Sequence, residues 1–213
     1  AELFSSYVEC VPSSEKVKKV METVRRHLNS RIQEQLYVVC LSEDILRADK
    51  IYRYLKVLFL RGASAADQLQ IPAVYEVFKL CRSVYNEKHQ FIEFLRFSQM
   101  SEGFLAGKIQ PKNDVAELIA PYFADRLPEE NWLICDIGRG KAAVHVKGEK
   151  WFLAEISSDE LEKICIQSDE KDWEKLWKTF FTAIAIEQRK NPDCQRSHLP
   201  LRFRPLMTEF QSF

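Results

Sequence analysis

The sequence lacks an excess of charge of either sign, and it lacks any long apolar run. Lys and Arg total 31, Asp and Glu total 31, and the formal net charge at pH 7 is zero. Because phosphate groups attract clustered positive charge, such a chain can bind nucleic acid or acidic lipid only through a local patch. No segment approaches the roughly 18 apolar residues that a membrane-spanning helix needs. These absences predict a protein without a membrane partner and without a global attraction to DNA.

The sequence also lacks the recognisable motifs of nucleotide-binding and catalytic sites. The glycines of "GRGK" (residues 138–141) do not have the spacing of a P-loop. No Gly-x-Ser-x-Gly run is present, and neither is the C-x3-C-x2-C run that would ligate a radical-SAM cluster. The sequence therefore favours a chain without a cofactor and without catalytic activity of its own, although an enzyme of unfamiliar type stays open.

The cysteines are spread singly and never form a C-x-x-C pair. Most stand beside apolar residues, which is typical of small buried hydrophobes rather than of a disulfide scaffold or a zinc finger. Reduced thiols predict a cytoplasmic protein. The chain opens "AELFSSYVEC" without an initiator Met and without a visible signal peptide, and we expect it to be a fragment. The six are Cys10, Cys40, Cys81, Cys135, Cys165 and Cys194.

The first 90 residues show three helical patterns. A Pro-Ser-Ser-Glu run begins the first, Ser42 or Asp44 is expected to cap the second, and Gly62 is expected to end it. We therefore predict that residues 1–70 form a helical subdomain. The three patterns, in which apolar residues recur at helical spacing, cover residues 12–28, 42–62 and 71–90.

After residue 90 the pattern changes to short strands. Residues 91–111 predict two strands joined by a Ser-Glu-Gly turn, and a short helix at 112–128 is expected to be capped by Asn113 or Asp114. The order from residue 72 is α-β-β-α-β-β-β-α. That order predicts an α+β fold in which a five-stranded antiparallel sheet, flanked by helices, forms a domain of residues 71–213 packed with the helical subdomain. The remaining strands and a Trp-rich helix are predicted at residues 131–137, 141–147, 150–156 and 172–190.

The C-terminal segment "RKNPDCQRSHLPLRFRPL" carries five basic residues and one Asp. As a DNA-binding element, the five would meet phosphates and give a salt slope of about −4 to −5 in log–log terms. Alternatively, the apolar residues between them pin the segment to the sheet as an extended strap, with Pro192 and Pro200 opposing a helix. The five candidate DNA-binding residues are Arg189, Lys190, Arg196, Arg202 and Arg204.

An enzyme would need a polar pocket, and the chain offers one candidate set. On a strand through residues 91–97, Arg96 would share a face with Ile92 and Phe94, so it would be partly buried and paired with Glu87, Asp125 or Asp136. A catalytic histidine would also need an orienting partner and a reactive group close by. The candidate catalytic residues are His89, Arg96, Gln195 and His198.

Metal binding has little support in the sequence. Cys194 and His198 stand four residues apart, which is ligand spacing on a helix, but the neighbouring prolines oppose a helix there. A closed zinc site also needs four ligands, and His145 or Cys135 could be recruited to it only if the fold happened to bring them close. We therefore predict no metal site.

A second basic element lies near the N-terminus. Residues 16–31 carry six Lys and Arg on a predicted helix. Such a helix can contact DNA, although a solvated charged face explains the pattern as well.

Four stretches resemble the DUF4130-type family of bacterial DNA metabolism and repair proteins. They cover most of the chain from about residue 50 onward, and the last, a Trp-rich helix followed by N-P-x-x-Q and an aromatic, basic tail, is the most specific. The stretches are "IYRYLKVLFLRG", "VYNEKHQFIEFLRFSQM", "PKNDVAELIAPYFADRLPEENWLI" and "LWKTFFTAIAIEQRKNPDCQRSHLPLRFRPLMTEF".

The resemblance implies a pathway rather than a reaction. It implies a radical-SAM-type partner protein of DNA modification or repair, and similar domains are joined to some uracil-DNA glycosylase-like proteins. Family members begin with an extra segment containing Asp-Gly-Ser/Thr-Phe-Glu-Gly, which this sequence lacks.

The leading hypothesis is therefore a non-catalytic accessory module in bacterial DNA repair or modification, contacting DNA through the C-terminal basic segment. One alternative is an unfamiliar enzyme acting on a nucleic-acid component, with the four candidate catalytic residues in one concave pocket. The other is an assembly protein without nucleic-acid contact, which predicts an exposed apolar patch.

Overall fold

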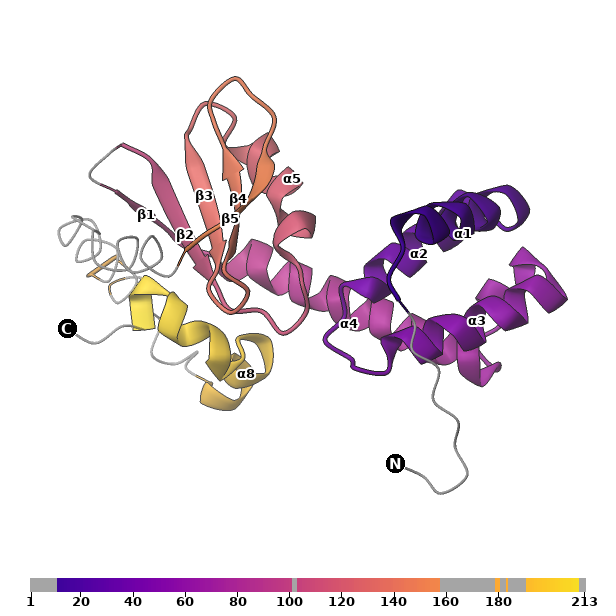
Figure 1. Cartoon of the computed structure of the whole chain (residues 1–213). Helices are drawn as coiled ribbons and strands as arrows, with labels where there is room; N and C mark the ends of the chain where they lie inside the picture. The colour runs from indigo at the N-terminus through magenta and orange to yellow at the C-terminus, as the bar shows by residue number, and fades with distance from the viewer. Residues whose placement is uncertain (1–10, 101–102, 158–178, 181–182, 184–190, 211–213) are drawn as a thin grey trace. The chain divides into compact units, whose positions relative to one another are not determined.

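The computed structural model describes residues 11–100, 103–157, 179–180, 183 and 191–210. The chain divides into two compact units, Ala1–Arg82 (unit 1) and Ser83–Phe213 (unit 2). Helix α4, Pro72–Phe94, crosses this boundary, so each unit contains a part of it (Figure 1). Whether residues 1–70 fold as a subdomain on their own stays a prediction. Within the described residues, no helix combines the length and the apolar character that crossing a membrane requires.

The described part of unit 1 is helical. The predicted helices at 12–28 and 42–62 are confirmed, but the second helix along the chain was not predicted. Its sequence signals are present, because Asn29 caps it by accepting a hydrogen bond from the backbone N–H of Ile32 (2.8 Å). The elements are α1 (Ser14–His27), α2 (Ser30–Cys40), α3 (Arg47–Arg61), the 3-10 helix η1 (Ala63–Asp67) and the first part of α4.

The start of α3 differs from the prediction, whereas its end agrees with it. Asp44 accepts a hydrogen bond from the backbone N–H of Leu46 (2.7 Å), and Ser42 accepts one from Asp44 (3.3 Å), so both side chains stabilise a turn before the helix. Neither caps α3, which begins at Arg47. Gly62 ends the helix with φ 85°, a conformation that glycine adopts without strain.

The core of unit 1 includes the inner face of α3. Tyr54 and Leu58 are buried there, one helical turn apart. The Tyr54 hydroxyl donates a hydrogen bond to the Gln35 side chain (2.7 Å), so its polar end is satisfied inside the unit. Burial raises the pKa of Tyr54 to about 12.

Unit 2 contains the five-stranded sheet that the sequence predicts, in strand order β1-β2-β3-β4-β5. Three of its four strand pairs are antiparallel, but β2 and β3 are parallel. The chain passes through a helix between these two strands, and that crossover returns it to the same end of the sheet. The strands are β1 (Phe97–Gln99), β2 (Leu105–Ile109), β3 (Trp132–Asp136), β4 (Lys141–His145) and β5 (Phe152–Glu155).

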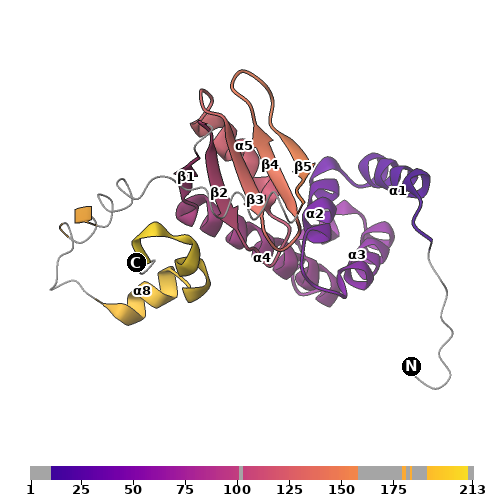
Figure 2. The ribbon, with the colours of Figure 1, turned by 60° about the vertical axis from the view of Figure 1, so that its left-hand side comes forward.

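The crossover helix α5 (Ala116–Arg126) packs against β3 and β4 on one face of the sheet (Figure 2). Its N-cap residue is Val115, so neither Asn113 nor Asp114 caps it as predicted. The exposed Pro121 lies inside the helix without ending it. The buried residues have helical spacing and are Ala116, Ile119, Ala120 and Phe123.

The C-terminal segment is helical, and the prediction of an extended strap is wrong. Helix α8 (Pro192–His198) is followed by two 3-10 helices, η3 (Leu201–Leu206) and η4 (Thr208–Phe210). Pro192 fits because the first residue of a helix needs no N–H partner, and Asn191 caps the helix by accepting from the backbone N–H of Cys194 (3.0 Å). Most of the predicted Trp-rich helix at 172–190 lies outside the described residues.

Candidate functional site

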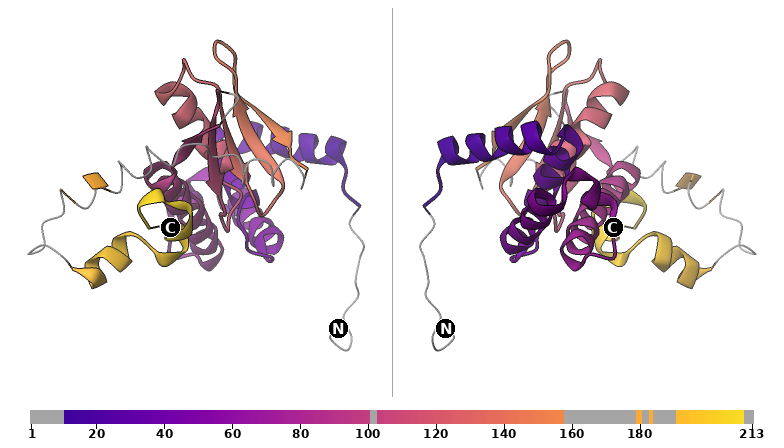
Figure 3. Two further views of the ribbon diagram at one scale, coloured as in Figure 1. Left: turned by 90° about the vertical axis from the view of Figure 1, so that its left-hand side faces the viewer. Right: turned by 90° about the vertical axis from the view of Figure 1, so that its right-hand side faces the viewer.

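The C-terminal segment is anchored to α4 by an aromatic side chain. Phe203 in η3 is 2% exposed. Its ring meets Phe91 edge-on (4.9 Å between ring centroids) and lies tilted against Phe94 (5.3 Å). Burying a phenylalanine contributes about 2–3 kcal/mol, and each aromatic pair adds about 1 kcal/mol. The contact places η3 beside the second half of α4 (Figure 3, yellow and magenta).

A buried carboxylate lies next to this aromatic contact. The side chain of Glu87 on α4 is 3% exposed, and it accepts a hydrogen bond from Arg202 Nη1 (2.7 Å). It also accepts from the backbone N–H groups of Lys112 (2.9 Å) and Asn113 (2.7 Å) and from the Asn113 amide (2.6 Å). Because a buried charge is tolerated only when paired and hydrogen-bonded, Glu87 requires Arg202.

A second ion pair joins the chain end to the segment between α4 and β1. Arg96 Nη2 contacts Glu209 Oε1 at 2.8 Å, and the Glu209 side chain is almost fully buried. The predicted strand placement of Arg96 is wrong, because α4 continues to Phe94 and β1 begins only at Phe97. The predicted acidic partners were also wrong, since they excluded Glu209. We call Arg202, Phe203 and Glu209, with their partners on and after α4, the C-terminal clamp.

The loop between β2 and α5 is held by a further set of charges. Asp136 at the end of β3 is fully buried, and Arg139 pairs with it (3.0 Å) while donating to the carbonyls of Pro111 and Lys112. Burial raises the pKa of Asp136, and the Arg139 guanidinium opposes that rise. These groups satisfy one another, which indicates a structural network rather than a reactive centre.

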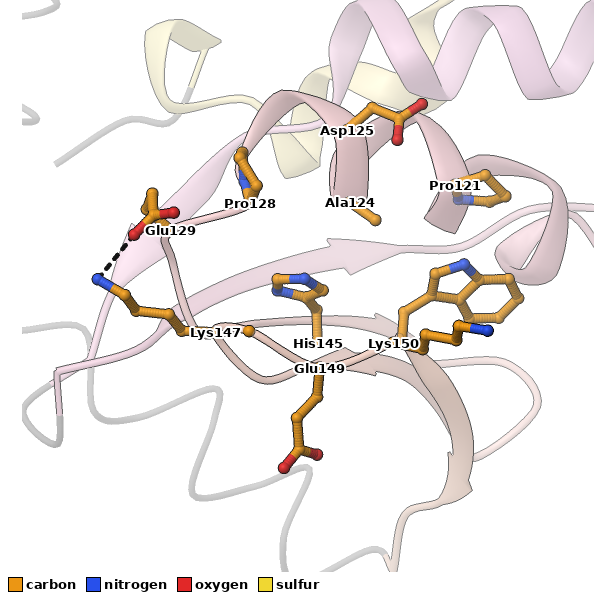
Figure 4. Close-up of a pocket in the computed structure, with 11 residues that line it drawn as sticks. Pro121, Ala124, Asp125, Pro128, Glu129, His145, Lys147, Glu149 and Lys150 are labelled. Carbon is orange, nitrogen blue, oxygen red and sulfur yellow. Dashed lines mark ion pairs between the residues drawn. The ribbon is translucent and has the colours of Figure 1, made fainter.

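A pocket of about 680 Å³ lies between the end of α5 and the β4–β5 turn. His145 at the end of β4 is buried, and its ring stacks on Trp132 (5.1 Å between centroids, 9° between planes). Its Nδ1 lies 2.9 Å from the carbonyl oxygen of Glu130. Since a carbonyl can only accept, Nδ1 carries a proton, and Nε2 is the ring nitrogen that this contact leaves for another partner. Figure 4 shows the ring pointing from β4 towards Ala124 of α5.

Unit 1 has an unusual surface on α3. Its buried face is apolar, and its other side carries Tyr52, Phe59 and Leu60, all exposed. The exposed Lys56 lies between them in the sequence, with its ammonium over the Tyr52 ring (5.6 Å to the centroid). Leu60 is 82% exposed, and Ile45, just before the helix, is 89% exposed. Large apolar side chains gathered on the exposed side of a helix favour a surface that another molecule covers. We call Ile45, Tyr52, Phe59 and Leu60 the outer face of α3.

Unit 1 also contains a bridging lysine close to its surface. Lys50 Nζ contacts Asp44 Oδ2 at 2.8 Å and Glu76 Oε2 at 3.1 Å. The hydrogen bond from Lys50 is the main cause that lowers the pKa of Asp44, and the hydrogen bond from Lys79 is the main cause that lowers the pKa of Glu76, with Lys50 second. The pKa of Lys50 is raised by the same carboxylates. These charges tie α3 to the start of α4.

A family model described as a domain of unknown function, DUF4130, matches residues 45–209. The chain belongs to the DUF4130 family. The predicted family is thus confirmed, and the match extends from the start of the outer face of α3 through the His145 pocket to the C-terminal clamp of the DUF4130 chain. No curated protein and no solved structure matches. The expected links to bacterial DNA repair and to a radical-SAM partner stay predictions.

The candidate catalytic residues of the DUF4130 chain have separate environments. Arg96 belongs to the clamp, His89 is exposed on α4, and Gln195 and His198 are exposed on α8. Within the described residues, no hydrogen bond joins any two of these four side chains. The prolines did not prevent a helix around Cys194, so Cys194 and His198 do have ligand spacing on α8. In the part of the chain that is described, no group of three or more His, Cys, Asp or Glu side chains is arranged to hold a metal ion.

The candidate DNA-binding residues also differ from one another. Arg196 is 61% exposed on α8 and only 3.9 Å from Asp193 at its closest. Arg202 is held by Glu87, and Arg204 lies over the Phe210 ring (4.9 Å to its centroid). Arg189 and Lys190 lie outside the described residues. The clamp therefore engages Arg202, while Arg196 stays accessible.

Sequence reasoning named His145 only as a possible zinc ligand, and it missed the pocket around this residue and the central role of Glu87. A signal for His145 exists, because alternation along "KAAVH" places it on the same strand face as Ala143 and Lys141. Its stacking on Trp132 follows from the β3–β4 register, in which the two residues are directly opposite. Glu87 was considered only as a partner for Arg96.

Proposed function

We propose that this DUF4130 chain is a non-catalytic accessory module of bacterial DNA repair or modification. It binds a partner protein through the outer face of α3 and contacts DNA through accessible basic residues of its C-terminal segment. The partner is a radical-SAM-type protein, as the family resemblance implies. The absence of a familiar catalytic motif in the sequence favours the accessory role.

The observation that carries the proposal is the exposed apolar surface of α3. Tyr54 and Leu58 already fill the core side of the helix, so Phe59 and Leu60 contribute nothing comparable to folding. Apolar area removed from water yields about 25 cal/mol per Å², so covering these side chains favours association. Aromatic side chains such as Tyr52 and Phe59 are also enriched in the cores of protein interfaces.

The radical-SAM-type protein of the same genome provides the test of the docking surface. Its affinity for the full chain is measured by calorimetry with the wild type and with a Phe59→Ser/Leu60→Ser variant. A Val17→Ser/Val20→Ser variant is the matched control, because it removes two exposed apolar side chains from α1 instead. We expect the α3 variant to bind at least tenfold more weakly, equivalent to about 1.4 kcal/mol. Equal binding by both variants would exclude this surface.

The DNA contact involves fewer residues than the sequence suggests. With Arg202 paired to Glu87 and Arg204 packed on Phe210, the remaining candidates are Arg196, which is exposed, and Arg189 and Lys190, which lie outside the described residues. Three phosphate contacts give a salt slope of about −3 in log–log terms, against about −4 to −5 for five.

Fluorescence anisotropy of labelled DNA across a salt series tests this contact. Arg196→Ala should reduce the magnitude of the slope by about 0.9, whereas Arg126→Ala, which removes an exposed arginine from α5, should leave it unchanged. Absent binding would favour an assembly protein without nucleic-acid contact. An equal effect of both variants would mean that Arg196 is not a specific DNA contact.

A further inference from the structure

The His145 pocket has the size and the lining of a ligand site, and the docking surface on unit 1 does not involve it. Its volume of about 680 Å³ lies within the range of small-molecule pockets, about 300–1,000 Å³. Figure 4 shows Pro121 and Ala124 of α5 on one side and the His145 ring on the other. An apolar side facing a flat ring forms a slot suited to a planar group.

The hydrogen-bonding groups of the pocket include acceptors on His145 and Asp125, with Lys150 as a donor. Nδ1 of His145 is used by the Glu130 carbonyl, so Nε2 is the acceptor that the ring offers to a ligand. Asp125, exposed at the end of α5, adds a carboxylate that forms no ion pair within the described residues. The lysine opposite, Lys147, is already paired with Glu129 (2.8 Å), as the dashed line in Figure 4 marks.

The charge of the lining selects against phosphate. Three acidic residues and two lysines line the pocket, so its formal charge is −1. Glu149 points away from His145 in Figure 4, but its charge still repels an anion approaching the turn. The charged lining residues are Asp125, Glu129, Glu149, Lys147 and Lys150.

An aromatic side chain completes the lining. Trp151 is partly exposed, and no ring within the described residues stacks on it. Indole is the aromatic face that attracts cations most strongly, with a contribution of about 0.5–2 kcal/mol. An acidic, aromatic pocket with acceptors on His145 and Asp125 therefore fits a planar cation with several N–H donors.

We propose that the His145 pocket binds an arginine side chain of a peptide segment. The guanidinium group is planar, always charged and carries five N–H donors, so it can lie in the slot against Trp151 while donating to His145 Nε2 and Asp125. A lysine offers one compact charge and fits less well. A nucleobase has a planar face too, but the phosphates attached to it meet the acidic lining.

The probe for this site is the peptide acetyl-Gly-Arg-Gly-amide, titrated into the full chain. Its citrulline counterpart, which has nearly the same shape and no charge, is the first control. Binding is followed through the indole N–H resonance of Trp151, which is identified as the signal that Trp151→Phe removes. We expect the arginine peptide to shift this resonance with a Kd of about 1 mM, and the citrulline peptide to leave the resonance in place.

A charge-neutralising variant locates the contact. Asp125→Asn should weaken the binding about tenfold, because a charge-assisted hydrogen bond is lost. Glu155→Gln, which neutralises an exposed carboxylate on β5 outside the pocket, should bind as the wild type does.

Three results would overturn the proposal: no shift with the arginine peptide, an equal shift with the citrulline peptide, or equal weakening by both variants. A shift caused by a short single-stranded DNA instead would assign the pocket to a nucleobase. Since none of these readouts involves α3, they are independent of the partner-binding test.

Discussion

Unit 1 buries apolar side chains and keeps its ion pairs near the surface, whereas unit 2 buries three carboxylates and pairs each with an arginine. In the described part of the chain the buried acidic side chains are those of Glu87, Asp136 and Glu209, and all three belong to unit 2. In unit 1 the pair of Arg31 and Asp67 has both side chains well exposed, and the outer face of α3 exposes apolar side chains.

This contrast distinguishes contacts that a unit makes within itself from surfaces that it can offer to other molecules. The polar groups of unit 2 contact its own loop and its own C-terminal segment, so they fix one fold. Unit 1 has apolar side chains that its own core does not use, so they are available to a partner. Arg202, one of the charged residues that the sequence offered for DNA binding, is therefore structural, and we propose α3 as the partner-binding surface.

The largest effect is expected from Phe203→Ala. Removing this ring from its contacts with Phe91 and Phe94 should lower the free energy that holds η3 against α4 by about 4 kcal/mol. Leu201→Ala, which truncates an exposed neighbour, should cost less than about 0.5 kcal/mol. Amide hydrogen exchange at residues 201–206 measures both. Equal protection in the two variants would contradict the role of the clamp.

Glu87→Gln should cost about 3 kcal/mol, because Arg202 and the backbone N–H groups of the loop lose a charged acceptor inside the protein. Glu93→Gln is its control, since Glu93 is exposed on the same helix. The two variants are compared by urea denaturation of the full chain and by amide hydrogen exchange in the loop at residues 111–114. If Glu87→Gln left the free energy of unfolding unchanged, water would already reach the Glu87 carboxylate in the folded protein.

Two leucines on α3 test the contrast within a single helix. Leu58→Ala should cost about 3 kcal/mol, because Leu58 is fully buried. Leu60→Ala should change the free energy of unfolding by less than about 0.5 kcal/mol. If Leu60→Ala destabilised the isolated chain as much, the outer face of α3 would belong to its core, and the docking proposal would fail.

The smallest effect is expected from pH. Asp44 and Glu76 have lowered pKa values, so the stability they contribute is present above their ordinary pKa and is lost as the pH falls through the lowered values. Asp136 has a raised pKa, so the folded state binds its proton more tightly, and protonation stabilises unit 2 as the pH falls from the raised to the ordinary value. Thermal unfolding of wild type and Lys50→Met between pH 7 and about pH 3 should show their difference shrinking with acid. If the difference in thermal stability stayed constant with pH, the ion pairs of Lys50 would not contribute to stability.

The fold was largely accessible from the sequence because local patterns set it. Helical spacing identified α1, α3 and α4, and alternation with turn residues identified the strands. What failed depended on contacts distant in sequence. Arg96 could not be assigned to Glu209, because that pairing requires the chain end to fold back onto α4. The proline argument at Pro192 failed for a local reason, since the first helical position accepts proline.

The candidate site was less accessible than the fold. Arginines were read as phosphate ligands because one dimension shows their charge and not their partners. The pocket at His145 was overlooked because the environment of this residue depends on the register that sets Trp132 opposite it. A pocket formed by the end of a helix and a turn between strands has no continuous sequence signature.

The pairing of Glu87 with Arg202 also has a consequence for the order of events during protein synthesis. The two residues are 115 positions apart in the chain. At about 5–20 residues per second, a ribosome needs on the order of ten seconds to make the arginine after the glutamate. Throughout that interval the carboxylate must stay in water, since it has no counter-charge with which to enter the interior. Unit 1 can acquire its native packing while translation continues, but unit 2 can complete its packing only after η3 has been synthesised.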